Sequence, residues 1–212
     1  MKKRIIVGIS GASGVIYGVR CLQLLGETDY ETHLVISEYG KLNIEIETTY
    51  SADEVMSMAD FAHDYTNMAA PISSGSFITT GMVVAPCTIK SLSGIANSYN
   101  DNLLVRAADI VLKEKRKLCL VVRETPLHKG HLRLLNMAAD MGAHILPPVP
   151  SFYNHPKTVE DIIDQTVGKI FDYFDIEHSL FERWSGRPSA EGAAAPASSP
   201  ARPRLREVKT RR

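Results

Sequence analysis

The fold is decided by residues 4–20, RIIVGISGASGVIYGVR. A short apolar run reaches three evenly spaced glycines, Gly8, Gly11 and Gly14, and a segment compatible with a helix follows. Glycines let the backbone approach a phosphate, and the first turn of a helix offers free N–H groups at the positive end of its dipole. The stretch therefore predicts a strand, a phosphate-binding turn and a helix, although a plain tight turn fits the same residues.

The rest of the chain repeats the alternation of strand and helix. Helical patterns separate the apolar runs, most clearly at residues 158–174, where Thr158 and Asp161 predict a capping box. This order predicts an α/β single domain of three layers, with a Rossmann-like or flavodoxin-like doubly wound parallel sheet. Residues 60–77 are expected to form a long irregular loop. Five strands are predicted, at Arg4–Ser10, Thr32–Ser37, Gly81–Ala85, Leu118–Val122 and His144–Leu146.

Composition narrows the class of protein. The chain has 212 residues, of which 44% are hydrophobic and 23% charged, as in ordinary globular proteins. It contains no apolar run long enough to span a membrane, so we expect no membrane partner. The three cysteines share no metal-ligand spacing and are odd in number, which favours a reducing cytoplasm and no metal site.

The C-terminal residues 187–212 differ in composition from the rest. They carry seven Lys/Arg and two Asp/Glu, a net charge of +5, and consist largely of Ala, Pro, Ser and Arg. Such a segment cannot bury enough apolar surface to order itself. We therefore predict a domain over residues 1–186 and a disordered basic tail over residues 187–212. Because the tail lacks interleaved aromatic residues, a nucleic-acid partner is not expected.

Four polar features follow the predicted strands. They are the SGASG turn, Ser37, PCTIKS at residues 86–91 and RETP at residues 123–126. Ligands of open α/β sheets bind beyond the carboxyl ends of the strands, where all four would lie. Ser10 and Ser13 add hydroxyl donors to the turn. Because the second strand ends in Ser37 and not in an acid, a mononucleotide is favoured over NAD.

The third and fourth features carry further candidate side chains. Thr88, Lys90 and Ser91 could bind a phosphate or a ribityl chain, and Cys87 is more typical of a structural thiol than of a nucleophile. Arg123 could clamp an anion and Glu124 could act as acid or base, although adjacent opposite charges also suit a solvated rim.

Three cations and one tyrosine complete the candidate set. Arg106 and Lys113 on the preceding helix could face an anion or only solvent. The segment PPVPSFYNHP, residues 147–156, could form a stiff wall beside a flat or apolar ligand. The hydroxyl of Tyr153 could donate a hydrogen bond to a phosphate. Lys169 lies on the helix that follows.

Taken together, the sequence resembles the UbiX-type flavin prenyltransferases, a family that includes the small subunit of hydroxyarylic acid decarboxylase systems. The resemblance runs from about residue 3 to residue 186 and implies a large homo-oligomer, a dodecamer. It implies that the chain binds reduced FMN, attaches a dimethylallyl group from dimethylallyl monophosphate to N5 and C6, and supplies prenylated FMN to a UbiD-type decarboxylase. The motifs that carry it are GISGASGVIYGVR, SSGSF, PCTIKSLSGIA, RAADIVLKEKRKL, VVRETPLH and PPVPSFYNHP.

The resemblance also implies roles at matching positions. Glu124 would be the acid/base, with Ser13 near the departing phosphate. The prenyl phosphate would be bound by Tyr153 and Lys169, assisted by Arg106 and Lys113, which a neighbouring subunit could supply. Some members have Arg at the position of Lys169. A lysine keeps the positive charge but lacks the planar guanidinium that can bind a phosphate through two N–H groups. The residues implied for FMN are Gly11, Ala12, Ser13, Ser37, Thr88, Ile89, Lys90, Ser91 and Arg123.

Two rival functions remain open. One is a non-catalytic FMN carrier or accessory subunit of a decarboxylase, because binding and catalytic sites share residues. The other is a flavin-dependent decarboxylase that acts directly on its substrate. The absence of paired Asp-rich motifs favours a monophosphate donor held without a metal.

Overall fold

Six parallel strands form one sheet, and their burial follows from their composition. The runs RIIVGI, GMVVAPC and KLCLVV are apolar almost throughout, as expected of strands covered on both faces. The order across the sheet is β3-β2-β1-β4-β5-β6, so the chain moves outward in one direction from β1 and then returns to the other side of it through β4. The strands are β1 (Arg4–Ile9), β2 (Glu31–Ile36), β3 (Phe61–His63), β4 (Gly81–Cys87), β5 (Lys117–Val122) and β6 (His144–Ile145).

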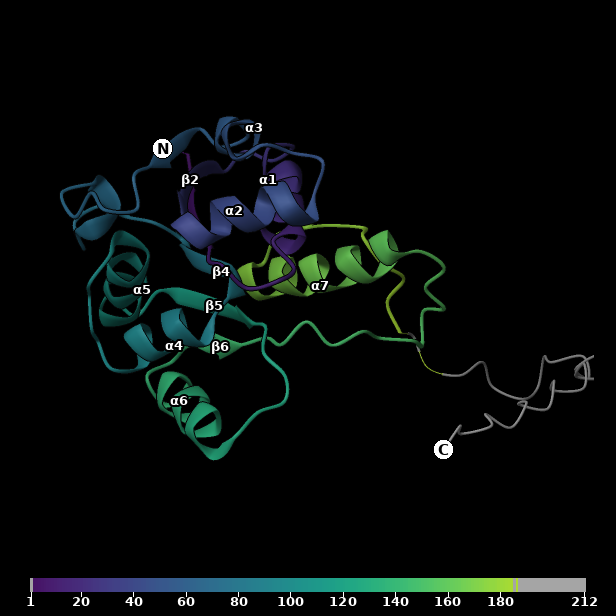
Figure 1. The fold of residues 1–212 in the computed structure, drawn as a ribbon. Coiled ribbons are helices and arrows are strands. Elements are labelled where there is room, and N and C mark those ends of the chain that lie inside the picture. Colours follow the sequence, from purple (N-terminus) through teal and green to yellow (C-terminus); the bar gives the residue numbers. More distant parts are fainter. Residues whose placement is uncertain (1, 185, 187–212) are drawn as a thin grey trace, which may run out of the picture. The chain divides into compact units, whose positions relative to one another are not determined.

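Helices cover both faces of this sheet (Figure 1). Apolar residues of α1 and α7 share one buried core with the sheet, and those of α4 and α5 share the other, with α6 packed beside α4. The predicted three-layer, doubly wound α/β fold is therefore confirmed. The helices are α1 (Ile16–Leu25), α2 (Glu38–Glu47), α3 (Ala52–Ser57), α4 (Ile89–Ala96), α5 (Leu103–Lys113), α6 (Lys129–Asp140) and α7 (Val159–Phe174), with a short 3₁₀ helix at Pro71–Ser73.

Two parts of the prediction were wrong. Residues 60–77 contain the sixth strand, β3, which pairs with β2 at the sheet edge; its three residues are largely exposed and so carry no apolar run. Ser37 is the N-cap of α2 and not the last residue of β2. Helix α2 itself had not been predicted, because only Gly40 and Ile44 are buried in it and no helical period of apolar residues results.

The predicted capping box of α7 is confirmed. The backbone N–H of Asp161 donates to the Thr158 hydroxyl over 3.1 Å, and the backbone N–H of Thr158 donates to the Asp161 carboxylate over 3.0 Å. These bonds satisfy donors that a helix start leaves free.

The computed structural model describes residues 2–184 and 186. Contacts divide the chain into one unit that ends at Glu182 and a second that begins at Arg183. The predicted tail lies outside the described residues, and the predicted domain boundary at residue 186 stays a prediction. Within the described residues, no helix combines the length and apolar character needed to cross a bilayer.

Candidate functional site

Two helix N-termini meet at a cavity beside the carboxyl ends of β1, β2 and β4. Ser37 caps α2 by accepting a hydrogen bond from the N–H of Gly40 over 3.1 Å, and Thr88 caps α4 by accepting one from the N–H of Ser91 over 3.0 Å. The two helix dipoles make this cavity favourable for an anion. Its volume is about 350 Å³, and its walls are Ser10, Gly11, Ser37, Glu38, Tyr39, Tyr65, Thr88, Lys90 and Ser91.

Ser10 joins two walls of the cavity. Its hydroxyl donates to the carbonyl of Pro86 over 2.9 Å and accepts from the backbone N–H of Thr88 over 2.8 Å, while the residue is 1% exposed. The expectation that Ser10 donates to a ligand is therefore wrong, because its proton is used inside the protein. The bond fixes the end of β1 against the start of α4 and so sets the width of the cavity.

The SGASG turn is as tight as its glycines predict. A Cβ on Gly11 would lie 2.3 Å from the Cβ of Tyr39, so the turn touches α2 directly. Gly14 has a φ of 93°, which side chains rarely permit. The hydroxyl-bearing Ser13 between them is exposed.

Glu47, at the last position of α2, was missed by the sequence analysis. Its carboxylate accepts hydrogen bonds from the N–H of Gly14 over 2.7 Å and of Val15 over 3.3 Å. The N-cap of α1 has no side-chain cap of its own, so this carboxylate supplies the anion that the helix start favours. The sequence carries no signal for the contact, because Glu47 belongs to a helix that was not predicted.

Arg123 and Glu124 follow β5 and are both exposed. The N–H of Arg123 donates to the carbonyl of Cys87 over 3.1 Å, which fixes this loop beside the cavity. Burial raises the pKa of Tyr17, on the first turn of α1, while a hydrogen bond with Thr166 and the positive charge of Arg123 oppose the rise. The charge of Arg123 therefore acts on the first turn of α1, where the sequence analysis did not identify Tyr17. The Glu124 carboxylate accepts from the N–H of Thr125 over 3.0 Å.

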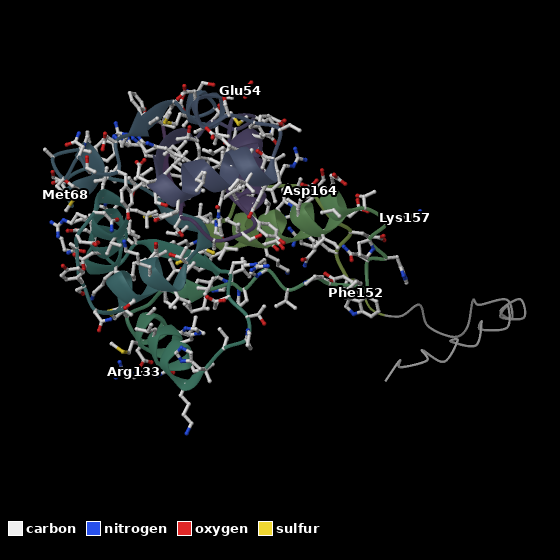
Figure 2. All side chains as sticks on the ribbon, in the orientation of Figure 1. Glu54, Met68, Arg133, Phe152, Lys157 and Asp164 are labelled. Carbon is white, nitrogen blue, oxygen red and sulfur yellow. The ribbon has the colours of Figure 1, made fainter. Side chains whose placement is uncertain are left out.

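The four residues predicted to bind the prenyl phosphate do not line this cavity. Tyr153 lies on the segment between β6 and α7, next to the exposed Phe152 (Figure 2). The Nζ of Lys169 lies 3.6 Å from the Asp172 carboxylate and 5.4 Å from the ring centre of Phe181.

Arg106 and Lys113, the other two, lie on one face of α5. The Nε of Arg106 donates to the carbonyl of Ser73 over 3.2 Å, and Lys113 pairs with Glu114. Both side chains are thus held toward residues 73–75 and not toward the cavity of their own chain. Of the remaining predicted residues, Ala12 lies in the turn and Ile89 begins α4, packed against the apolar core of that face.

The thiols take no part in this site. Burial raises the pKa of Cys87 to about 12, so the thiol is protonated at neutral pH. This agrees with the structural interpretation of Cys87. Within residues 2–184 and 186, no group of three or more His, Cys, Asp or Glu side chains is arranged to hold a metal ion.

Comparison with known proteins places this geometry in a family. The family model described as Flavoprotein matches residues 1–184. The flavin prenyltransferase UbiX of Salmonella typhimurium is 58% identical over 187 residues, which cover 87% of this chain and 99% of that protein. The chain belongs to the UbiX flavin prenyltransferase family.

Solved structures of the UbiX family share the fold. AnUbiX (PadA1), crystallised in complex with FMN and dimethylallyl pyrophosphate, is 45% identical and superposes with a TM-score of 0.87 over 89% of this chain and 100% of that one. The dodecameric FMN-dependent UbiX-like decarboxylase of Escherichia coli O157:H7 is 50% identical, with a TM-score of 0.85 over 86% of this chain and 100% of that one.

The UbiX-family cavity of this chain fits a phosphate on its own chemistry. Ser37 and Ser91 bring hydroxyl groups to it, and the Thr88 hydroxyl donates to Ser91 Oγ over 3.0 Å and so orients that group. Lys90 brings a positive charge, and both helix N-termini lie at the cavity. Hydroxyl, N–H and ammonium donors are those that a phosphate monoester needs. The phosphate end of a mononucleotide such as FMN is therefore compatible with the residues present.

Proposed function

We propose that this chain is a flavin prenyltransferase, which joins a dimethylallyl group from dimethylallyl monophosphate to N5 and C6 of reduced FMN and releases phosphate. The observation that carries the proposal is the cavity between the N-termini of α2 and α4, in a chain 58% identical to UbiX. The SGASG turn before α1 lies beside this cavity, with the backbone N–H groups of Gly14 and Val15 held by the Glu47 carboxylate.

The cavity would hold FMN. Ser37 and Ser91 would hold its phosphate together with the first N–H groups of α4, Thr88 would position the Ser91 hydroxyl, and Lys90 would balance the charge. Gly11 and Ala12 would let the rest of the flavin approach the backbone of the turn. When bound, the reduced flavin supplies the nucleophilic N5 and C6 atoms.

The prenyl phosphate would lie near Ser13 and Arg123. Ser13 lies in the turn before α1, and the positive charge of Arg123 acts on Tyr17 of that helix, so a hydroxyl and a positive charge would be available to stabilise a departing phosphate. Glu124, on the same loop as Arg123, would act as the acid/base of the transfer reaction. We retain the monophosphate as donor, and a direct comparison with dimethylallyl pyrophosphate tests that choice, because AnUbiX was crystallised with the pyrophosphate.

Tyr153, Lys169, Arg106 and Lys113 would serve the site of a neighbouring copy. Their contacts hold Arg106 and Lys113 toward residues 73–75 of their own chain, and a relative of 50% identity is dodecameric. Chains carrying Arg106→Ala, co-assembled with chains carrying Glu124→Gln, should regain turnover that neither variant has alone. Failure to regain it would place both residues in the site of one chain.

The product would be the cofactor of a UbiD-type decarboxylase, and we expect the protein in the cytoplasm. The described thiols Cys21, Cys87 and Cys119 are free and buried, which suits a reducing compartment.

The test is an anaerobic reaction of the full chain with reduced FMN and dimethylallyl monophosphate. A gain of one C5H8 unit in flavin mass, with release of free phosphate, is the expected result. Glu124→Gln should abolish the gain while FMN still binds, and Glu177→Gln, an exposed acid on the segment after α7, is the matched control that should react as wild type.

The same experiment separates the rival functions. A relative of 50% identity is named an FMN-dependent decarboxylase, so release of CO2 from an aromatic acid is measured alongside the flavin mass. Unchanged flavin with CO2 release would favour a direct decarboxylase. Unchanged flavin with tight FMN binding and no CO2 would favour a carrier, and either result would reject the transferase.

A further inference from the structure

The chain turns back along α7 directly after that helix ends. Asp175, the C-cap of α7, has a φ of 57°, in the left-handed region that reverses the chain. The N–H of Ile176 then donates to the carbonyl of Phe171 over 3.0 Å, and the Ile176 side chain is buried. Residues 176–181 form a return segment that runs along α7 toward its N-terminal end (Figure 1).

Two rings of the return segment lie against the backbone of α7 at Gly168. A Cβ at this position would lie 2.5 Å from Cε1 of Phe181 and 2.8 Å from Cε1 of His178. Because Gly168 has no side chain, both rings reach the helix. Lys169 follows in the sequence, and its Nζ lies 5.4 Å from the centre of the Phe181 ring. The return segment therefore packs beside the lysine that we assign to the prenyl phosphate.

His178 fixes the carboxylate that faces this lysine. The backbone N–H of Leu180 donates to Nδ1 of His178 over 3.2 Å, so this nitrogen carries no proton. The proton lies on Nε2, which donates to Oδ1 of Asp172 over 3.1 Å. The imidazole is only 4% exposed, so water has little access to this bond. The ring therefore holds the Asp172 carboxylate in one orientation.

The second oxygen of the same carboxylate faces Lys169. Oδ2 of Asp172 lies 3.6 Å from Nζ of Lys169, whose side chain is 45% exposed. This distance is that of an ion pair and is too long for a hydrogen bond, so the contact orients the ammonium group without using its N–H donors. The carboxylate and the Phe181 ring together restrict a flexible side chain. A side chain that is ordered before the ligand arrives lowers the entropy cost of binding.

We propose that Asp172, oriented by His178, is a positioning residue that holds the Lys169 ammonium against the Phe181 ring, ready for the phosphate of the prenyl donor. The proposal rests on the proposed function in one respect, that Lys169 binds this phosphate. A carboxylate has a second effect, because its negative charge repels a phosphate. The two effects have opposite signs. Loss of positioning raises the KM for the donor, whereas loss of the negative charge lowers it.

The experiment measures the KM for dimethylallyl monophosphate with the full chain, anaerobically and at saturating reduced FMN. Asp172→Asn keeps the size of the side chain and an acceptor for His178, but it removes the carboxylate beside Lys169. The KM should rise about 2- to 10-fold, as expected when one ordered side chain becomes mobile. Both kcat and the Kd for FMN should stay within twofold. Glu177→Gln removes an exposed negative charge from the same segment and should leave the KM unchanged.

Variants of His178 test whether the histidine acts through Asp172. His178→Phe keeps a ring but removes the N–H donor, so it should raise the KM as Asp172→Asn does. The double variant should raise the KM no further than the larger single change, because both changes act on one carboxylate. His178→Gln places an amide N–H near the position of Nε2 and should bring the KM back to within twofold of the wild type.

Several results would contradict the proposal. An unchanged KM in Asp172→Asn would show that Lys169 needs no positioning, and a lowered KM would show that Asp172 competes with the phosphate. Equal effects of His178→Phe and His178→Gln would assign the histidine to packing alone. An unchanged KM in Lys169→Ala would refute the phosphate-binding role of Lys169 and the positioning with it, while prenyl transfer by the wild-type chain would still stand.

Discussion

Replacing Gly11 with alanine should both destabilise the protein and weaken flavin binding. The new Cβ would lie 2.3 Å from the Cβ of Tyr39, 3.0 Å from its carbonyl carbon and 3.2 Å from its Cα. These atoms belong to the backbone and the root of a side chain, so no rotamer change relieves the overlap. Either the SGASG turn or the start of α2 must move.

The size of the effect follows from this geometry. Adding a methyl group to a filled contact costs about 1–3 kcal/mol. We expect about 2 kcal/mol, and in a unit of this length that corresponds to a fall in Tm of about 4–8 °C. Movement of α2 would displace Ser37 and Tyr39 from the cavity wall, so the Kd for FMN should rise at least tenfold.

Thermal unfolding and FMN titration at matched protein concentration are the assays. Gly26→Ala is the control, because Gly26 has a φ of −61° and its added Cβ would meet only carbonyl oxygens at 3.3 and 3.6 Å. It should shift stability by less than about 0.5 kcal/mol. If Gly11→Ala matched this control in Tm and in Kd, the close contact between the turn and α2 would be refuted.

Three further predictions use other parts of the structure. Thr88→Ala and Thr158→Ala should each cost about 1 kcal/mol by removing a helix cap, but only Thr88→Ala should weaken FMN binding in titration. The hydrogen bond from the N–H of Thr32 lowers the pKa of Asp60. It therefore stabilises the fold above the ordinary aspartate pKa near 4, and this stability is lost as the pH falls further. Asp60→Asn should reduce the dependence of the free energy of unfolding on pH in the acid range. Because burial raises the pKa of every thiol, a thiol reagent at pH 8 should label none of the three until denaturant is added, and rapid labelling of the native chain would contradict this.

The parts of the fold that could be predicted are those with a local signal. Strands β1, β4 and β5 are continuous apolar runs, and α7 carries both a cap and a 3.6-residue period, so each appears in the sequence. Strand β3 and helix α2 lack such a signal because their stability comes from neighbours. Phe61 pairs with His33 across the sheet edge, and α2 buries only Gly40 and Ile44.

The candidate site divides in the same way. Ser37, Thr88 and Ser91 follow strands directly, and adjacent parallel strands bring their carboxyl ends together. Glu47 and Tyr65 reach the site from elements that only the fold orients, so no spacing in the sequence could identify them. Arg106 and Lys113 could be placed on one face of a helix from their spacing in the sequence. The spacing does not say whether that face contributes to the site of its own chain or to the site of a neighbouring copy.

Helix α2 has a further consequence for how ligand binding and local folding depend on each other. Its first turn lines the flavin cavity, its last residue caps α1 about 15 Å away, and two buried residues hold it to the body of the protein. An element so sparsely anchored opens at low free energy, and a ligand that contacts either end then closes it. Ligand binding in the cavity would thus slow amide hydrogen exchange along α2, a helix that contributes little to the core. The N-terminal and C-terminal ends of α2 would become protected together.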